Sequence, residues 1–97
     1  MTYDDAIKAT PVTLVEFFAT WCPHCRKMMP VVEQVKELLD GDATVIQLDI
    51  DENRQLAGQV EVEGVPTFII YRDGEEQWRH SGEIDGNALL AKVQSYM

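Results

Sequence analysis

The chain contains the segment Val15-Glu16-Phe17-Phe18-Ala19-Thr20-Trp21-Cys22-Pro23-His24-Cys25. Its first residues belong to a β-branched and aromatic run over 12–18, which is apolar except for Thr13 and Glu16. Such a run is typical of a strand that is covered on both faces. From Pro23 onward the apolar residues recur at helical spacing, which predicts a helix. The two cysteines are therefore expected where a buried strand ends and a helix begins.

Cys22 is expected at the N-cap of this helix or close to it. A sulfur there faces unpaired backbone N–H groups and the positive end of the helix dipole, so the pKa of Cys22 should fall and favour the thiolate that attacks disulfides. Cys25 follows about one helical turn later, so the two sulfurs can meet in a small ring. Pro23 suits the first helical position, where no N–H is needed. The pattern predicts that Cys22 attacks a disulfide and that Cys25 resolves the mixed disulfide.

The rest of the chain alternates between helix and strand signals. We predict helices over 3–9, 23–39, 51 or 53 to 58, and 85–97, and strands over 12–18, 44–50, 65–71 and 77–81. Pro30 should bend the long helix, and Asp73 with Gly74 should form a hairpin turn between the last two strands. Crossover helices imply parallel pairing and the hairpin adds an antiparallel pair, so we expect an α/β fold with a mixed sheet of four strands and helices on both faces.

Composition narrows the classes of protein and partner. The chain has 97 residues with 45% hydrophobic content, which is enough for one domain over residues 1–97. The net charge of -9 disfavours nucleic acid and anionic membrane as partners, because both would be repelled. The N-terminus does not read as a signal peptide and no apolar run reaches the roughly 20 residues of a spanning helix. We therefore expect a soluble, monomeric, cytoplasmic protein, with a mature secreted form that carries an added Met as the alternative.

Several motifs resemble the thioredoxin family at matching spacing. They are the segment 15–30, then Leu48-Asp49-Ile50-Asp51, then Val65-Pro66-Thr67-Phe68, and finally Gly82. The resemblance covers nearly the whole chain and implies a thioredoxin-like three-layer α/β/α fold, in which the family's usual first edge strand has no counterpart. It also implies a cis peptide before Pro66, packed against the cysteine pair, with the backbone of Val65 offered to an extended substrate segment.

The dipeptide between the cysteines departs from the family's usual Gly-Pro. Pro23-His24 resembles instead the bacterial periplasmic disulfide oxidases. The side chain of His24 would add a donor, and when protonated a charge, beside the Cys22 thiolate, which would stabilise the reduced form and make the disulfide a stronger oxidant. The alternative is that His24 is only a solvent-exposed residue at a helix start.

Glu16 matches the family's buried Asp beneath the cysteine pair. A carboxyl group in an apolar strand should have a raised pKa, and it could take the proton from Cys25 through a water molecule. Gln47 stands where the family usually has a Lys, so Glu16 lacks a charge partner. The alternative is that Glu16 leans to solvent.

Other interpretations of these residues give weaker sites. A metal half-site at the cysteines would have only His24 and His80 as nitrogen donors, although zinc takes four ligands. An inert disulfide is a further alternative. Asp49, Asp51 and Asn53 imitate a calcium loop, but Arg54 stands where that loop needs Gly, so they are interpreted as turn and cap residues. We expect no metal and no cofactor.

The resemblance implies a thiol:disulfide oxidoreductase that reduces or exchanges protein disulfides and is recycled by an enzyme similar to thioredoxin reductase. Trp21, Pro23, Val65 and Pro66 are the residues expected to contact the substrate. Whether the protein works as a reductase or as a more oxidising oxidase or isomerase stays open. A non-catalytic module that holds a peptide in the groove of Trp21, Val65 and Pro66 is the alternative from another class.

Overall fold

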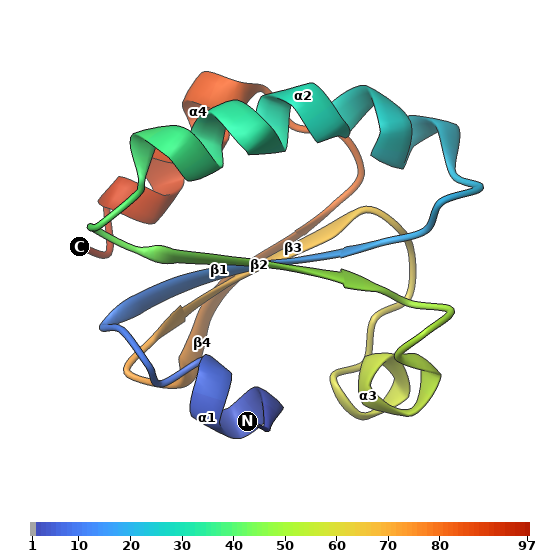
Figure 1. Cartoon of the computed structure of the whole chain (residues 1–97), viewed down its shortest axis with the longest axis horizontal. Coiled ribbons are helices and arrows are strands. Elements are labelled where there is room, and N and C mark those ends of the chain that lie inside the picture. The colour runs from blue at the N-terminus through green and yellow to red at the C-terminus, as the bar shows by residue number, and fades with distance from the viewer. Residues whose placement is uncertain (1) are drawn as a thin grey trace.

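The structure is a computed structural model that describes residues 2–97. Its centre is a four-stranded sheet in the order β2-β1-β3-β4, built from β1 (Val12–Phe18), β2 (Thr44–Asp49), β3 (Thr67–Arg72) and β4 (Glu75–Ser81). β1 pairs with β2 in parallel, as predicted, and β3 and β4 form the predicted antiparallel hairpin. β1 and β3 also pair antiparallel, so the parallel pairing expected through both crossover helices is wrong for β3. Helices α2 (Pro23–Leu38) and α4 (Gly86–Gln94) cover one face, while α1 (Tyr3–Ala6) and α3 (Arg54–Gln59) cover the other (Figure 1). The predicted three-layer α/β/α arrangement is confirmed.

β1 lies in the interior of the sheet and its first six residues are buried. Val12 and Leu14 belong to the core beneath α2 and α4. Val15 and Phe17 belong to the core on the side of α1 and α3. Successive side chains of a strand point to opposite faces, so both faces of β1 must be apolar. The prediction of a strand covered on both sides is confirmed.

The chain enters α2 directly from the end of β1, and this connection carries the two cysteines (Figure 1). Met28, Val32 and Val35 follow one another at helical spacing and are buried in the core between α2 and the sheet. Pro30 lies inside α2, which continues to Leu38. The apolar face of the helix thus fixes where its first turn, with the sulfur atoms, is held above the sheet.

Several element boundaries differ from the predicted ones. α1 ends at Ala6 rather than at residue 9 because the chain turns at Ile7 toward β1, and α4 ends at Gln94 rather than at residue 97. Thr2 caps α1 through a capping box, as its position predicted. Asn53 is the N-cap residue of α3, but its side chain donates to the carbonyl of Asp49 and makes no capping bond.

The hairpin is tighter than predicted. Asp73 and Gly74 both have positive φ angles, of 52° and 83°, which fit a two-residue turn. Arg72 therefore pairs directly with Glu75, and β4 begins two residues earlier than the sequence indicated. β3 begins at Thr67 and not at residue 65. Within residues 2–97, no helix is both long enough and apolar enough to cross a membrane.

Candidate functional site

Cys22 is the N-cap residue of α2, with extended dihedral angles of φ -87° and ψ 117°. Its sulfur accepts a hydrogen bond from the backbone N–H of Cys25 at 3.4 Å. The same thiol donates to the carbonyl oxygen of Val65 at 3.6 Å. Pro23 occupies the first turn, where no N–H is required. The predicted N-cap position of Cys22 is confirmed.

The pKa values of the two thiols are shifted in opposite directions. Burial works against ionisation of Cys22, but hydrogen bonds from the Cys25 thiol and from the backbone of Cys25 and His24, with the charge of Arg26, lower the pKa of Cys22 below its ordinary value. Burial raises the pKa of Cys25 to about 12. Both cysteines are free thiols and both are buried. Cys22 is therefore the group that supplies a thiolate, while Cys25 keeps its proton until something removes it.

Glu16 lies in the buried part of β1, with only 2% of its surface exposed, so the solvent-facing alternative is wrong. Burial raises its pKa, and the hydrogen bond from Gln47 Nε2 to Glu16 Oε1, 3.1 Å long, works in the other direction. Gln47 thus acts as a neutral partner across the β1–β2 pair. The charge of Glu16 also contributes to the raised pKa of Cys25, which places the carboxyl group within electrostatic reach of the second sulfur.

A groove of about 420 Å³ opens beside Cys22; we call it the cysteine groove. It is lined by residues from the β1–α2 connection and the first turn of α2, from the end of β2, from α3 and from the segment before β3, which are Trp21, Cys22, Pro23, His24, Ile50, Ala57, Val62, Glu63, Gly64 and Val65. The peptide bond between Val65 and Pro66 is cis, as the resemblance implied. The groove thus brings together three of the four residues predicted to contact the substrate, namely Trp21, Pro23 and Val65, whereas Pro66 is buried and does not line it.

Trp21 forms the open edge of the cysteine groove and is 61% exposed. Its Nε1–H donates to Asp51 Oδ2 at 2.9 Å, so the indole is held in one orientation by the loop after β2. Exposure of a large apolar ring beside a reactive sulfur favours the substrate-facing interpretation over the core interpretation. The role of Asp51 was not visible in the sequence, because 30 residues separate it from Trp21.

His24 is exposed and its imidazole is bonded to a residue that the sequence did not mark. Nδ1 of His24 and Oε2 of Glu83 are 2.5 Å apart. The hydrogen bond from His24 lowers the pKa of Glu83, so the carboxylate is the acceptor and Nδ1 carries the proton. Within residues 2–97, no hydrogen bond joins the imidazole ring to either sulfur. Glu83 is 59 residues away from His24, and no motif connects the two.

The residues considered for metal binding serve other bonds. The backbone N–H of Asp51 donates to Asp49 Oδ1 at 2.8 Å, and Asn53 donates to the Asp49 carbonyl. These are the turn bonds expected of such residues. The part of the chain from 2 to 97 has no group of three or more His, Cys, Asp or Glu side chains that could hold a metal ion.

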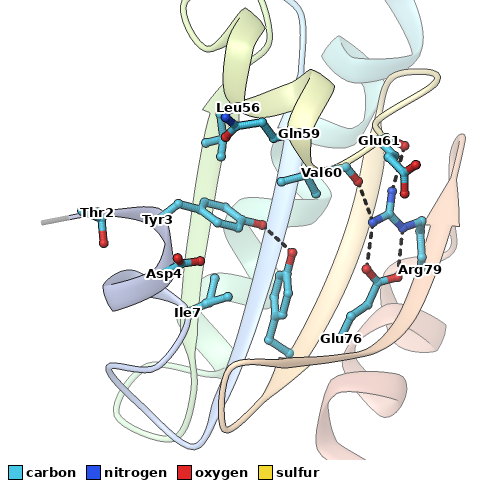
Figure 2. A pocket seen from close by; sticks show the side chains of 11 residues that line it. Thr2, Tyr3, Asp4, Ile7, Leu56, Gln59, Val60, Glu61, Glu76 and Arg79 are labelled. Atoms are coloured by element: carbon cyan, nitrogen blue, oxygen red, sulfur yellow. Dashed lines mark hydrogen bonds and ion pairs between the residues drawn. The ribbon is translucent and has the colours of Figure 1, made fainter.

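A second cavity, of about 630 Å³, lies between α1, α3 and the strands β3 and β4 (Figure 2). We call it the tyrosine pocket; its lining residues are Thr2, Tyr3, Asp4, Ile7, Leu56, Gln59, Val60, Glu61, Tyr71, Glu76 and Arg79. The hydroxyl groups of Tyr3 and Tyr71 are hydrogen-bonded to each other at 2.7 Å. Figure 2 shows the Tyr3 ring extending from α1 toward the strands. Arg79 forms two bonds to Glu76 and one each to the carbonyl oxygens of Val60 and Glu61.

Comparison with known proteins matches a family model described as Thioredoxin to residues 1–95. The curated thioredoxin of Staphylococcus saprophyticus is 44% identical over 73 residues, which are 75% of this chain and 69% of that protein. Thioredoxin Y, a chloroplastic protein of Oryza sativa subsp. japonica, is 32% identical over 95 residues, which are 97% of this chain. The chain spans 56% of the length of that relative.

Solved structures give the same result. A mutant thioredoxin from Halobacterium salinarum NRC-1 superposes with a TM-score of 0.88 at 40% identity, over 96% of this chain and 80% of that chain. Mitochondrial thioredoxin 3 from Saccharomyces cerevisiae, in its oxidized form, superposes with a TM-score of 0.86 at 27% identity, over 96% and 86% of the two chains.

Proposed function

The chain belongs to the thioredoxin family, and on that premise we propose that it is a thiol:disulfide oxidoreductase that reduces or exchanges protein disulfides through Cys22 and Cys25. The observation that carries the proposal is the difference between the two thiols at the start of α2. The pKa of Cys22 is lowered by hydrogen bonds to its sulfur, whereas the pKa of Cys25 is raised by burial. Cys22 is thus the thiol that ionises and attacks first, and Cys25 keeps its proton until the second step.

The reaction has two thiol exchange steps. The Cys22 thiolate attacks one sulfur of the substrate disulfide, so a bond from Cys22 to the substrate forms while the substrate's own S–S bond breaks and its released thiolate takes up a proton. Cys25 then loses its proton and attacks Cys22, which forms the Cys22–Cys25 disulfide and releases the second substrate thiolate. Two electrons pass from the protein to the substrate. A separate dithiol donor, an enzyme similar to thioredoxin reductase, restores the two thiols.

Glu16 is the proposed acceptor of the Cys25 proton, through a water molecule. The raised pKa of Glu16, its burial and its electrostatic effect on Cys25 support this role. Glu16→Gln removes the acceptor and keeps an oxygen for the Gln47 amide, so turnover should slow at high pH, above the raised pKa of Glu16, where the wild-type carboxylate is ionised and can take the proton. The measurement is the pH profile of the disulfide reduction rate. Unchanged rates across the profile would remove Glu16 from the mechanism.

The cysteine groove is the proposed docking site for an extended segment of the substrate. The carbonyl of Val65 meets only the Cys22 thiol, and the N–H of Val65 has no hydrogen-bond partner within residues 2–97. An extended chain placed along Val65 can pair its backbone with these two groups, as an added strand does. Trp21 and Pro23 would then contact its side chains at the open edge of the groove.

The proposed direction is reduction, in a reducing compartment such as the cytoplasm, by a monomer. One observation supports it: the imidazole of His24 is bonded to Glu83 and not to a sulfur. An oxidising poise would need the His24 side chain to stabilise the Cys22 thiolate directly. Because the His24 ring is bonded to Glu83, the Pro23-His24 dipeptide makes the Cys22–Cys25 disulfide less oxidising than the sequence indicates.

The test is catalysis of insulin disulfide reduction with dithiothreitol as electron donor, followed by the turbidity of the released insulin chains. The wild-type protein should accelerate the reaction, and Cys22→Ser should abolish the acceleration while thermal unfolding stays near the wild-type temperature. A peptide-binding module would behave differently. The wild type would not accelerate the reaction, and a double variant with Cys22→Ser and Cys25→Ser would bind an extended peptide as well as the wild type does.

A further inference from the structure

Glu83 is hydrogen-bonded to His24, the residue between Pro23 and Cys25. The contact between Glu83 Oε2 and His24 Nδ1 is 2.5 Å long, and the two side chains are 41% and 65% exposed. An isolated surface pair with this exposure would have little significance, because long side chains at a surface exchange partners easily. The question is therefore whether the backbone of Glu83 is fixed.

Two hydrogen bonds and one glycine turn hold the segment that carries Glu83. The N–H of Gly82 donates to the carbonyl of Pro66 at 2.8 Å, which attaches the segment to the residue after Val65. Gly82 has φ +98°, a conformation that favours glycine, and it turns the chain out of β4 at this point. On the other side, His80 Nε2 donates to the carbonyl of Glu83 at 3.1 Å.

His80 is itself supported by Trp78. Their rings stack with centroids 5.8 Å apart and an angle of 9° between the planes. The carboxylate of Glu83 is thus connected through its own backbone to His80 of β4 and, through Gly82, to Pro66. Its position relative to His24 is set by the fold.

The electrostatic consequence concerns the Cys22 thiolate. The groups that lower the pKa of Cys22 are the Cys25 thiol, backbone N–H groups and Arg26, and no hydrogen bond from the imidazole reaches the sulfur. The carboxylate both occupies the Nδ1 proton of His24 and offsets the positive charge that the ring carries when protonated.

We infer that Glu83 is a positioning residue for the redox potential: by holding the His24 imidazole, it keeps the Cys22–Cys25 disulfide less oxidising than the Pro23-His24 dipeptide alone would make it. The inference rests on the proposed function, because it needs a reversible disulfide. The relevant equilibrium is that of the protein disulfide with two glutathione thiols, which gives the protein dithiol and one glutathione disulfide. Stabilising the Cys22 thiolate stabilises the reduced protein and moves this equilibrium toward the dithiol.

The experiment is this equilibrium in a series of glutathione redox buffers at pH 7, for the wild type, Glu83→Gln, His24→Ala and the double variant. Glu83→Gln should move the equilibrium about threefold toward the dithiol, which is the scale of an exposed charge pair and corresponds to ~14 mV for a two-electron couple. In the His24→Ala background the same substitution should have no effect, because Glu83 acts through the ring. Glu52→Gln is the matched control: Glu52 is exposed, the charge change is the same, and no shift is expected.

Two results would overturn the inference. An unchanged equilibrium in Glu83→Gln would show that the carboxylate does not influence the pair. An equal shift with and without His24 would show that Glu83 acts by its own charge and not by positioning the ring. In both cases a wild-type protein that reduces insulin leaves the proposed function standing. A wild type that forms no exchangeable disulfide would remove the proposed function, and the inference with it.

Discussion

The cysteine groove and the tyrosine pocket lie at two different places in one small fold, and the larger of them is not the reactive one. The tyrosine pocket has about 630 Å³ against about 420 Å³ for the groove. In the tyrosine pocket the polar side chains bond to one another: Tyr3 to Tyr71, and Arg79 to Glu76 and to two carbonyl groups. In the groove, the sulfur of Cys22 is bonded only to the Val65 carbonyl and to the N–H of Cys25, and the N–H of Val65 has no hydrogen-bond partner within residues 2–97.

The pKa shifts of the titratable groups also differ between the tyrosine pocket and the cysteine groove. Burial raises the pKa of Tyr3 and of Tyr71, so both hydroxyl groups keep their protons and act as neutral hydrogen-bond partners. Cys22 is also buried, yet the N-terminus of α2 supplies donors that lower its pKa. The comparison teaches that cavity size does not locate chemistry in this protein. A group becomes reactive where the fold stabilises its ionised form.

The largest expected effect lies in the groove. Cys25→Ser should reduce multiple-turnover disulfide reduction by more than ~10³-fold, because the mixed disulfide at Cys22 loses its resolving thiol. The trapped adduct should be visible by mass spectrometry of the intact protein. The free energy of unfolding should change little, since the serine hydroxyl can replace the thiol as donor to the Cys22 sulfur. Full turnover by Cys25→Ser would break the assignment of unequal roles.

Arg79→Ala tests the tyrosine pocket. It removes the charged partner of Glu76 and leaves the carbonyls of Val60 and Glu61 without their donor, so the free energy of unfolding should fall by about 2 kcal/mol. The melting temperature should fall by ~10 °C, as measured by circular dichroism. Disulfide reduction at 25 °C should stay within twofold of the wild type. A large loss of activity in the folded variant would connect the tyrosine pocket to the chemistry.

Tyr71→Phe should have a smaller effect of the same kind. The substitution removes one hydroxyl from the Tyr3–Tyr71 pair and keeps the ring that packs at 5.9 Å from Tyr3. The free energy of unfolding should fall by about 1 kcal/mol. Urea denaturation measures it, and Tyr3→Phe is the matched control that removes the other half of the same bond. If either variant lost activity without losing stability, the pocket would need a functional interpretation.

The effect of pH should be smallest and comes from Glu16, which lies between the two regions. Its pKa is raised in the folded state, so the folded protein holds a proton that the unfolded chain has released. Stability should therefore decrease as the pH rises above the ordinary glutamate pKa of about 4.3, until the raised value is passed. Glu16→Gln lacks this slope. The difference between the two proteins in free energy of unfolding, measured from pH 4 to pH 8, should shift in favour of the variant; a constant difference would contradict it.

Local signals in the sequence predicted the part of the site that lies on one element. The apolar run of β1, the helical spacing after Pro23 and the N-cap position of Cys22 follow from residues that are close together in the chain, and the structure confirms them. The predicted burial of Glu16 is confirmed for the same reason, because it stands within an apolar strand.

Contacts between distant segments could not be predicted in this way. The bond from Trp21 to Asp51 and the bond from His24 to Glu83 join loops that only the complete sheet brings together. The tyrosine pocket was missed for the same reason, since Tyr3 and Tyr71 are 68 residues apart. The sequence shows the type of each side chain but not where an exposed one points, so the orientation of the His24 ring had to come from the structure.

Pro30 interrupts the backbone hydrogen bonding of α2. Because proline has no N–H, the carbonyl of Arg26 receives no bond from the next turn, and the first turn is attached to the rest of the helix less firmly. Cys25 packs in a small cluster with Ala19, whereas the helix beyond Pro30 is embedded in the main core. The first turn, which follows Cys22 and carries Cys25, therefore has one backbone hydrogen bond fewer to the rest of α2 than an uninterrupted helix would give it.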